Sequence, residues 1–222
     1  MIIVAGWCRS GTSIMFKSIV ESGFSPGDAS ILTPESFSFR ILIHRILIDI
    51  GVPGVVFTKK RIGELPKWTS EPLVATDKKG AIKPALDRVI NLEADVLKNP
   101  TVTFALPTMQ TMDYFKDAKY IWMRRDPWDA AKSLIRLKCQ KKRVRSIYRG
   151  VLTTNMAYQL YLKNDRELQR IMPTLNHIEI QHKDFVNRDK KTFAAVSEFI
   201  GTRLNTHLIN KKKTYAGKRR MA

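Results

Sequence analysis

The sequence predicts a three-layer α/β fold in which helices cover both faces of a central parallel sheet. Two observations predict it. Short β-branched segments alternate along the chain with longer segments of helical periodicity. The first such segment, residues 2–5, runs through a glycine-containing loop directly into a helix. The 222 residues suffice for one domain, which we place at 1–210, and we expect the basic tail at 211–222 to be mobile.

The elements follow in a regular order. After the strand at 2–5, a helix is expected at 13–22 because apolar residues recur at helical spacing and Gly23 ends it. Further strands are expected in the short β-branched or alternating segments 55–58, 73–76, 102–105, 120–123 and 177–181. Further helices are expected at 37–50, 85–97, 127–172 (with breaks near Gly150) and 193–200. Asp126 and Pro127 are typical of the N-cap and first position of the third of these.

The charge balance favours anionic partners. Lys and Arg total 39 against 20 Asp and Glu, which gives a net charge of +19. Such an excess suits nucleotides, nucleic acid, anionic glycans or an acidic membrane surface. The basic segment 136–149 holds one aromatic residue, Tyr148, so we interpret it as a solvated face and do not expect nucleic acid as a partner. The most apolar stretch, 41–57, contains charged residues, Gly and Pro, and is not expected to span a membrane.

Cysteine usage and the N-terminal residues favour a cytoplasmic protein. Cys8 and Cys139 allow one pair, which is not a disulfide framework. The first residues have no basic segment and only a short apolar run, unlike a signal peptide. The four histidines show no metal-binding spacing with the cysteines, so we expect no metal.

The loop after the first strand has the composition of a phosphate-binding loop. Gly6-Trp7-Cys8-Arg9-Ser10-Gly11-Thr12-Ser13 has the glycine spacing of the Walker A pattern, but Thr12 stands where that pattern has Lys. Its cation, Arg9, lies inside the loop, and hydroxyls follow at Thr12 and Ser13. The Walker lysine and a magnesium-holding hydroxyl serve triphosphates. This loop therefore suits a 5′-phosphate group better, the alternative being a βα turn that binds nothing.

A second candidate phosphate site follows the strand at 120–123. Arg125 lies at the carboxyl end of that strand, where open α/β sheets bind ligands. Ser133 lies eight residues later, two helical turns into the next helix, and can face the same crevice. An Arg fork and a hydroxyl at that point suit a phosphate. The alternative is that both residues belong to an ordinary solvated surface.

Together the two motifs resemble those of the sulfotransferase family that uses 3′-phosphoadenosine 5′-phosphosulfate (PAPS). In that family, Lys or Arg followed by Ser-Gly-Thr and then Thr or Ser binds the 5′-phosphosulfate, and Arg9-Ser10-Gly11-Thr12-Ser13 matches it. An Arg followed by an acid or amide, Pro, and a Ser eight residues from the Arg binds the 3′-phosphate, and Arg125 to Ser133 matches it. A third, softer match places His182 where the family has Tyr, which implies a cofactor-binding position.

The resemblance leaves the catalytic base open. Many cytosolic members carry a Lys-x-His-Leu-Pro segment whose His is the base, whereas the corresponding segment here, Thr103-Phe104-Ala105-Leu106-Pro107, has Ala105 in that place. Some family branches use a Glu after the first helix, which makes Glu35 the candidate base. The alternative for Glu35 is a first-turn acid of a helix with Thr33 as N-cap and Pro34 next. Asp28 and His182 are the competing bases.

The resemblance implies a P-loop kinase-like architecture and an enzyme that transfers a sulfuryl group from PAPS to a hydroxyl or amine. Arg9 would take part in catalysis by holding the leaving phosphate, adenosine 3′,5′-bisphosphate would be the nucleotide product, and no metal would be required. The acceptor is unknown, and the charge excess favours an anionic one. Its pocket is expected between the segments 25–39 and 59–70. Alternatives are a P-loop nucleotide or small-molecule kinase, and a non-catalytic basic protein that binds nucleotides or nucleic acid.

Overall fold

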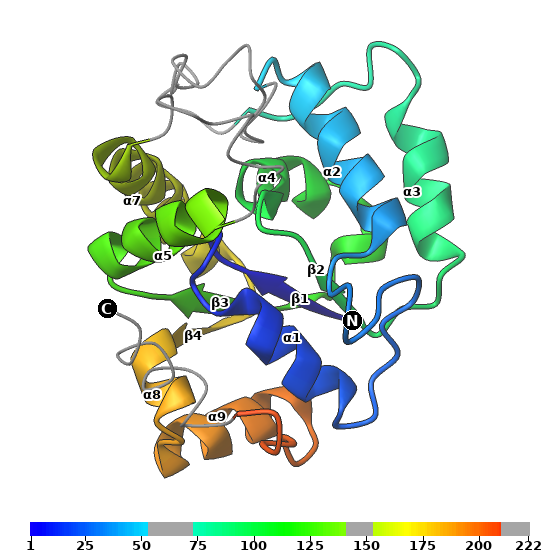
Figure 1. The fold of residues 1–222 in the computed structure, drawn as a ribbon. Helices are drawn as coiled ribbons and strands as arrows, with labels where there is room; N and C mark the ends of the chain where they lie inside the picture. The colour runs from blue at the N-terminus through cyan, green and yellow to red at the C-terminus, as the bar shows by residue number, and fades with distance from the viewer. Residues whose placement is uncertain (53–72, 141–152, 210–222) are drawn as a thin grey trace.

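A four-stranded parallel sheet forms the centre of the described part of the chain (Figure 1). The computed structural model describes residues 1–52, 73–140 and 153–209. The strands, in the spatial order β2-β1-β3-β4, are β1 (Ile2–Ala5), β2 (Val96–Lys98), β3 (Lys119–Arg124) and β4 (His177–Gln181). The register pairs Val4 with Lys98 and Ala5 with Trp122. The carboxyl ends of all four strands therefore lie at one edge of the sheet.

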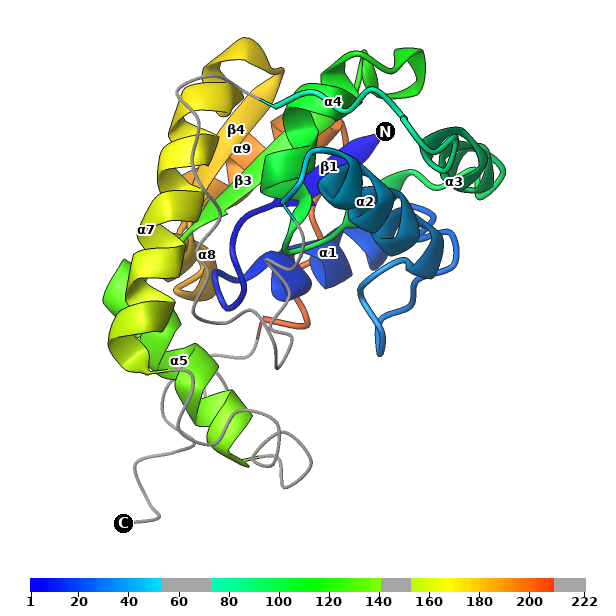
Figure 2. The ribbon, with the colours of Figure 1, turned by 90° about the horizontal axis from the view of Figure 1, so that it is seen from above.

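Helices cover both faces, so the predicted three-layer α/β fold is confirmed. Side chains alternate along β1: Ile3 and Ala5 join one core cluster, and Ile2 and Val4 join the other. The first cluster packs against α2 (Phe37–Asp49), α3 (Ile82–Ile90), α4 (Leu106–Gln110) and α7 (Thr154–Ile171). The second packs against α1 (Thr12–Val20), α8 (His182–Val186) and α9 (Lys190–Ile200). Helix α5 (Pro127–Gln140) lies beside α7, as both ribbon views show (Figure 2).

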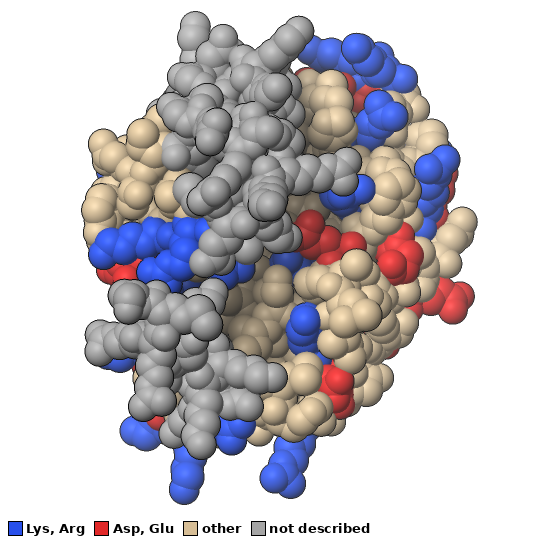
Figure 3. Space-filling view, in the orientation of Figure 1, with Lys and Arg blue, Asp and Glu red and all other residues tan. Residues whose placement is uncertain are grey.

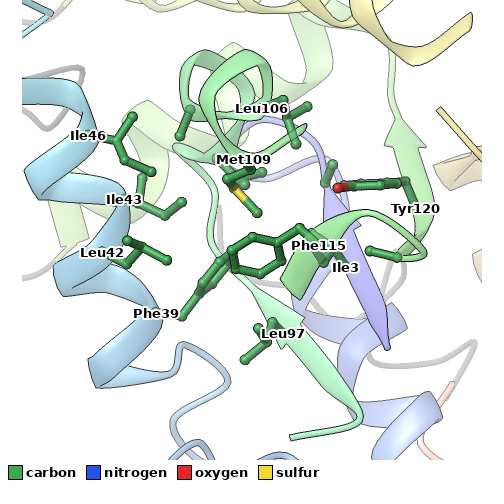
Figure 4. Packing of buried hydrophobic residues seen from close by; sticks show 14 of the residues in the cluster. Ile3, Phe39, Leu42, Ile43, Ile46, Leu97, Leu106, Met109, Phe115 and Tyr120 are labelled. Atoms are coloured by element: carbon green, nitrogen blue, oxygen red, sulfur yellow. The ribbon is translucent and has the colours of Figure 1, made fainter. Parts of the chain in front are cut away.

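The first core cluster is built from an amphipathic helix face against the sheet (Figure 4). Helix α2 contributes Phe39, Leu42, Ile43 and Ile46, whose spacing places them on one side of the helix. They pack with Phe115, at the end of the short helix η2 (Asp113–Phe115), and all are almost fully buried. Burying side chains of this size contributes about 1.5–3 kcal/mol each. This packing fixes the start of α2, and with it the loop that carries Glu35, relative to the sheet.

The strand expected at 102–105 is wrong, and the helix expected at 85–97 is present but shorter than predicted. Residues 102–105 form the 3₁₀ helix η1 (Val102–Ala105). Its β-branched residues follow a turn in which the Asn99 side chain accepts hydrogen bonds from the Thr101 N–H (2.8 Å) and hydroxyl (2.7 Å). The helix expected to run to Leu97 ends at Ile90. A turn at Asn91–Glu93, with Glu93 at φ 48°, separates it from β2, so Val96 belongs to a buried strand.

Residues 73–76 belong to no helix or strand among the described residues, which corrects the prediction for this segment. Side chains satisfy their backbone instead. The Ala75 N–H donates to Thr108 Oγ1 (2.8 Å), and the N–H groups of Thr76 and Lys78 donate to the Asp49 carboxylate (2.8 and 2.9 Å). Because side chains accept hydrogen bonds from these backbone N–H groups, the segment can lie outside the sheet without leaving those groups unsatisfied.

The remaining helices lie close to their expected places. Asp126 caps α5, since its Oδ1 accepts a hydrogen bond from the Asp129 N–H at 2.8 Å, as predicted. The expected long helix at 127–172 consists of α5 and α7, with Thr153 as N-cap of α7 and the short helix η3 (Met172–Thr174) after it. The expected strand at 55–58, the loop at 59–70, the tail at 211–222 and most of the basic segment 136–149 lie outside the described residues.

Candidate functional site

The loop between β1 and α1 is packed so closely that two of its positions require glycine. Gly6 has φ 135°, and a Cβ there would lie 2.5 Å from the Met123 carbonyl oxygen. Gly11 has φ 102°, and a Cβ there would lie 2.5 Å from Cδ2 of His182. Both angles are ones that residues with a side chain rarely adopt. The loop therefore rests directly on the ends of β3 and β4.

The start of α1 presents free backbone donors at this edge of the sheet. The helix begins at Thr12, and its N-cap, Gly11, has no side chain to satisfy the first N–H groups. No acidic residue lies in the first turn. Unsatisfied N–H groups and the positive end of the helix dipole favour an anion at this point. The backbone at this point suits an anion, in the place where the loop sequence predicts a phosphate cradle.

The loop hydroxyls differ in their surroundings. The Ser10 hydroxyl is buried and donates to the Trp7 carbonyl at 2.7 Å, and the Ser10 N–H donates to the same oxygen at 3.1 Å. Ser10 therefore shapes the loop from inside. Thr12 is buried at the first position of α1, whereas Ser13, next to it, is partly exposed. Of the three, Ser13 is the most accessible to a ligand.

Arg9 joins the loop to the second predicted phosphate site. Its Nε donates to Oγ of Ser133, on α5, at 3.0 Å. Arg125, directly after β3, donates from a terminal guanidinium nitrogen to the Arg9 carbonyl oxygen at 3.0 Å. Arg9 also has φ 73°, a conformation that costs a residue with a side chain about 1–3 kcal/mol. The structure therefore brings together Arg9, Ser133 and Arg125, which are far apart in the sequence.

Tyr161 of α7 holds the backbone of Arg125 on both sides. Its hydroxyl accepts a hydrogen bond from the Arg125 N–H (2.9 Å) and donates one to the Arg125 carbonyl (2.7 Å). Desolvation raises the pKa of Tyr161 to about 12, so the hydroxyl keeps the proton that it donates. The neighbouring Arg124 has a different role, because it pairs with Asp165 (2.8 Å) and Glu179 (3.0 Å). Only Arg125 of the two points toward the loop.

The charges around this loop are positive. Desolvation, followed by the charge of Arg125, lowers the pKa of Arg9. Desolvation, followed by the charges of Arg125 and Arg9, lowers the pKa of His182 from 6.5 to about 4, so this ring is neutral at pH 7. Nε of Arg125 is buried and has no hydrogen-bond partner among the described residues. A desolvated donor of this kind, beside a second guanidinium, fits an anionic ligand.

Basic side chains continue outward from this site over α5. Figure 3 shows Lys and Arg gathering on the left of that view, and Lys132 and Arg136 of α5 are exposed. Such a surface attracts anions toward the adjacent loop, with a strength that decreases with salt.

Glu35 lies at the same edge of the sheet, beside the last residue of β2. Its Oε1 accepts a hydrogen bond from Nζ of Lys98 at 3.0 Å. The Lys98 side chain is 3% exposed and that of Glu35 43%. Because Lys98 pairs with Val4, this ion pair lies one strand away from the phosphate loop. The expectation that Glu35 belongs to the first turn of a helix is wrong: α2 begins at Phe37 with Ser36 as N-cap, whose hydroxyl accepts from the Phe39 N–H.

Asp28, a competing candidate base, is occupied at the start of α2. Its Oδ2 accepts a hydrogen bond from the Ser38 N–H at 2.8 Å. Desolvation opposes ionisation of this carboxyl, but hydrogen bonds from the Ser36 hydroxyl and the Ser38 N–H outweigh it and lower the pKa of Asp28. Asp28 therefore secures the loop that carries Glu35.

Sequence reasoning missed two residues of this arrangement. Lys98 directly follows the helix expected at 85–97, and only its place at the end of β2 makes it the partner of Glu35. Tyr161 is one of several apolar positions of α7, and nothing in its spacing indicates the hydrogen bonds to Arg125. Among the described residues, no group of three metal-binding side chains occurs, and no helix has the length and apolar character needed to cross a bilayer.

The fit between Gly11 and His182 gives a testable prediction. Gly11→Ala is expected to lower the free energy of unfolding by about 1–3 kcal/mol because of its positive φ, and to lower it further because the new Cβ meets the His182 ring. Gly23→Ala is the matched control, since Gly23 has the same φ of 102° with nothing within 4 Å of its Cβ position. Denaturant unfolding measures both. Equal losses in the two variants would contradict close packing of His182 on the loop.

Comparisons with known proteins agree with this fold. A family model described as "Sulfotransferase family" matches residues 33–206, which begins after the phosphate loop. Among solved structures, the sulfotransferase domain from the Synechococcus PCC 7002 olefin synthase aligns with a TM-score of 0.53 and 17% identity, over 95% of this chain and 76% of that one. The sulfotransferase domain from the curacin biosynthetic pathway gives 0.54 and 16%, over 94% and 76%.

A sulfotransferase from Alicyclobacillus acidocaldarius aligns with a TM-score of 0.51 and 17% identity, over 90% of this chain and 80% of that one. At these identities the alignments show the fold. No curated protein matches the sequence significantly.

Proposed function

Because the chain belongs to the sulfotransferase family, we propose that it is an enzyme that transfers a sulfuryl group from PAPS to a hydroxyl or amine of an acceptor. The observation that carries this proposal is the meeting of two anion-binding groups, the loop after β1 and the Arg125–Ser133 pair, through Arg9. A ligand with two separated phosphate groups suits this arrangement. We assign the activity to a single domain of residues 1–210 and, from the cysteine usage, to the cytoplasm.

The residues divide between the two phosphate groups of the donor. We assign the N–H groups at the start of α1 and the hydroxyls of Thr12 and Ser13 to the 5′-phosphosulfate, and Ser10 and Gly11 shape the loop that carries them. Arg125 and Ser133 are assigned to the 3′-phosphate. Arg9 belongs to the loop and contacts both Ser133 and Arg125, and His182 packs on Gly11 of the loop. These donors suit a phosphate without a metal ion, because their own positive charge faces it.

In the proposed reaction a base takes the acceptor's proton, the acceptor oxygen or nitrogen bonds to sulfur, and the bond from sulfur to the phosphate oxygen breaks to leave adenosine 3′,5′-bisphosphate. Negative charge then develops on that phosphate oxygen. Arg9 and the N–H groups of α1 stabilise it, which is the electrostatic contribution to catalysis that this chain offers.

Glu35 is the group that best fits the base. Asp28 is engaged by the backbone of α2, and His182 stands beside two guanidinium groups that disfavour its protonated form. Glu35 has its side chain partly exposed at the edge of the sheet, and Lys98 fixes one of its oxygens. Its second oxygen remains available to an acceptor.

Ligand choice tests the donor. Adenosine 3′,5′-bisphosphate is expected to raise the melting temperature and to bind more tightly than ATP–magnesium or adenosine 5′-monophosphate, since only the bisphosphate engages both groups. Calorimetric titration with the three ligands measures this. Tighter binding of ATP–magnesium would replace the sulfotransferase proposal with a kinase. Formation of labelled product from labelled PAPS and a panel of acceptors would then identify the acceptor.

A further inference from the structure

His182 lies at the end of β4, in contact with the phosphate loop. It is the first residue of α8, follows β4 without a linker, and is 9% exposed. The edge of its ring that carries Cδ2 faces Gly11, and Cε of Met123 approaches the same glycine from β3. Nδ1 of the ring is buried and has no hydrogen-bond partner among the described residues. A buried polar atom without a hydrogen-bond partner is unfavourable, and a ligand or a proton can change that.

The charges near the ring are positive. The other titratable groups on the elements around it are Cys8 and Arg9 in the loop, Lys17 on α1, Lys119, Tyr120 and Arg124 on β3, Arg125 directly after β3, His177 and Glu179 on β4, Lys183 and Asp184 on α8, and Lys190, Lys191 and Glu198 on α9. Of the described groups, Arg125 and Arg9 are the ones whose charges act on the ring. The one acid on β4, Glu179, is paired with Arg124. Without a bound anion, therefore, the positive charges of Arg9 and Arg125 disfavour protonation of His182.

On the basis of the proposed function, we propose that a phosphate group bound between the α1 N-terminus and Arg125 places a proton on His182, which then acts as the third cation of the site. A phosphate dianion adjacent to the ring reverses the sign of the local potential. The imidazolium, unlike the neutral ring, donates from both nitrogens, so protonation makes donors of both Nδ1 and Nε2. Both changes favour the protonated form only while the anion is present.

The expected pH dependence has a definite sign. The free protein has a His182 pKa of about 4. If the bound state has a pKa of about 6.5 or higher, binding takes up a proton between these values, and affinity increases as the pH falls through that range. At pH 6 the free ring is about 1% protonated and the bound ring about three-quarters protonated, so uptake is about 0.7 proton per ligand. Phosphate groups titrate near pH 6 as well, and a variant must separate the two contributions.

Calorimetry separates proton uptake by His182 from proton uptake by the phosphate groups of the ligand. Adenosine 3′,5′-bisphosphate is titrated at pH 6 in two buffers of different ionisation enthalpy, with the parent protein, His182→Gln, and the control His44→Gln, which changes an exposed histidine on α2. The expected result is about 0.7 proton more for the parent than for His182→Gln, and no change for His44→Gln. Equal proton uptake in all three would overturn the proposal. If His182→Gln does not fold, His182→Asn takes its place.

Proton NMR of the imidazole signals gives a second measurement on the parent protein. The His182 signal, identified by its loss in the variant, is expected to titrate with a pKa at least one unit higher when bisphosphate is bound. Inorganic phosphate serves as a second probe. If the bisphosphate does not bind at all, the donor assignment fails, and a His182 pKa that is unchanged by inorganic phosphate would then separately refute the proton coupling. Unchanged titration with bound bisphosphate refutes the coupling and leaves the donor assignment standing.

Discussion

Glu35→Gln is expected to lower kcat by about 10²–10⁴-fold, the range typical of losing a general base. Gln keeps an oxygen that can accept the hydrogen bond from Lys98, so the buried lysine is not left without a partner. It cannot take a proton from the acceptor. Affinity for adenosine 3′,5′-bisphosphate is therefore expected to stay within a few-fold of the parent. Turnover of labelled PAPS and calorimetric binding measure the two quantities separately.

The control for this variant is Glu198→Gln, which removes an exposed carboxylate on α9, away from the carboxyl edge of the sheet. It is expected to leave kcat unchanged. If Glu35 only stabilises the fold, the opposite result is expected: Glu35→Gln would change the melting temperature while turnover stays within a few-fold of the parent. That outcome would remove Glu35 as the base and return the search to Asp28 and His182.

Arg125→Ala is expected to weaken binding of adenosine 3′,5′-bisphosphate by about 10–150-fold, which corresponds to about 1.5–3 kcal/mol for a lost charge-assisted contact. Adenosine 5′-phosphosulfate lacks the 3′-phosphate, and its affinity is expected to change little. Arg9→Ala is expected to weaken both ligands, because Arg9 belongs to the loop and also contacts Ser133. Calorimetric titration of both variants with both ligands gives the four affinities.

Lys132→Ala is the matched control for lost charge. It removes a cation from α5 whose ammonium lies over the Trp128 ring, at 5.6 Å from its centroid, and which is exposed. Any weakening that it causes measures the general positive field and should disappear at high salt. Equal losses for both ligands in Arg125→Ala would contradict the assignment of Arg125 to the 3′-phosphate.

The features that the sequence predicts correctly are those specified by residues close together in the chain. The loop at 6–13, the cap at Asp126 and the strand at 177–181 are each specified by residues within a short window: glycines, a capping acid, and alternating side chains. The meeting of Arg9 with Arg125 and Ser133 then follows, because parallel strands end at the same edge of a sheet.

The features that the sequence could not predict depend on contacts made across the fold. Val96 and Leu97 continue the apolar pattern of the preceding helix, and only pairing with β1 makes residues 96–98 a strand. Arg124 and Arg125 are chemically identical neighbours, and the acids that hold Arg124 come from α7 and β4. The 3₁₀ helix at 102–105 shows the same limit, since a side chain–backbone turn outweighs the β-propensity of its residues.

The two hydrogen bonds of Tyr161 have a consequence for which ligands fit. They fix the backbone of Arg125, and the Arg9 carbonyl fixes its guanidinium, so neither end of this residue can follow a ligand. The distance between the α1 N-terminus and Arg125 is therefore fixed by the fold. It selects ligands by the distance between their anionic groups. A molecule with two anionic groups at a different separation can reach one of them but loses the other. Under the proposed function, selectivity among nucleotides is expected to come from the spacing of their phosphates more than from the number of charges they carry.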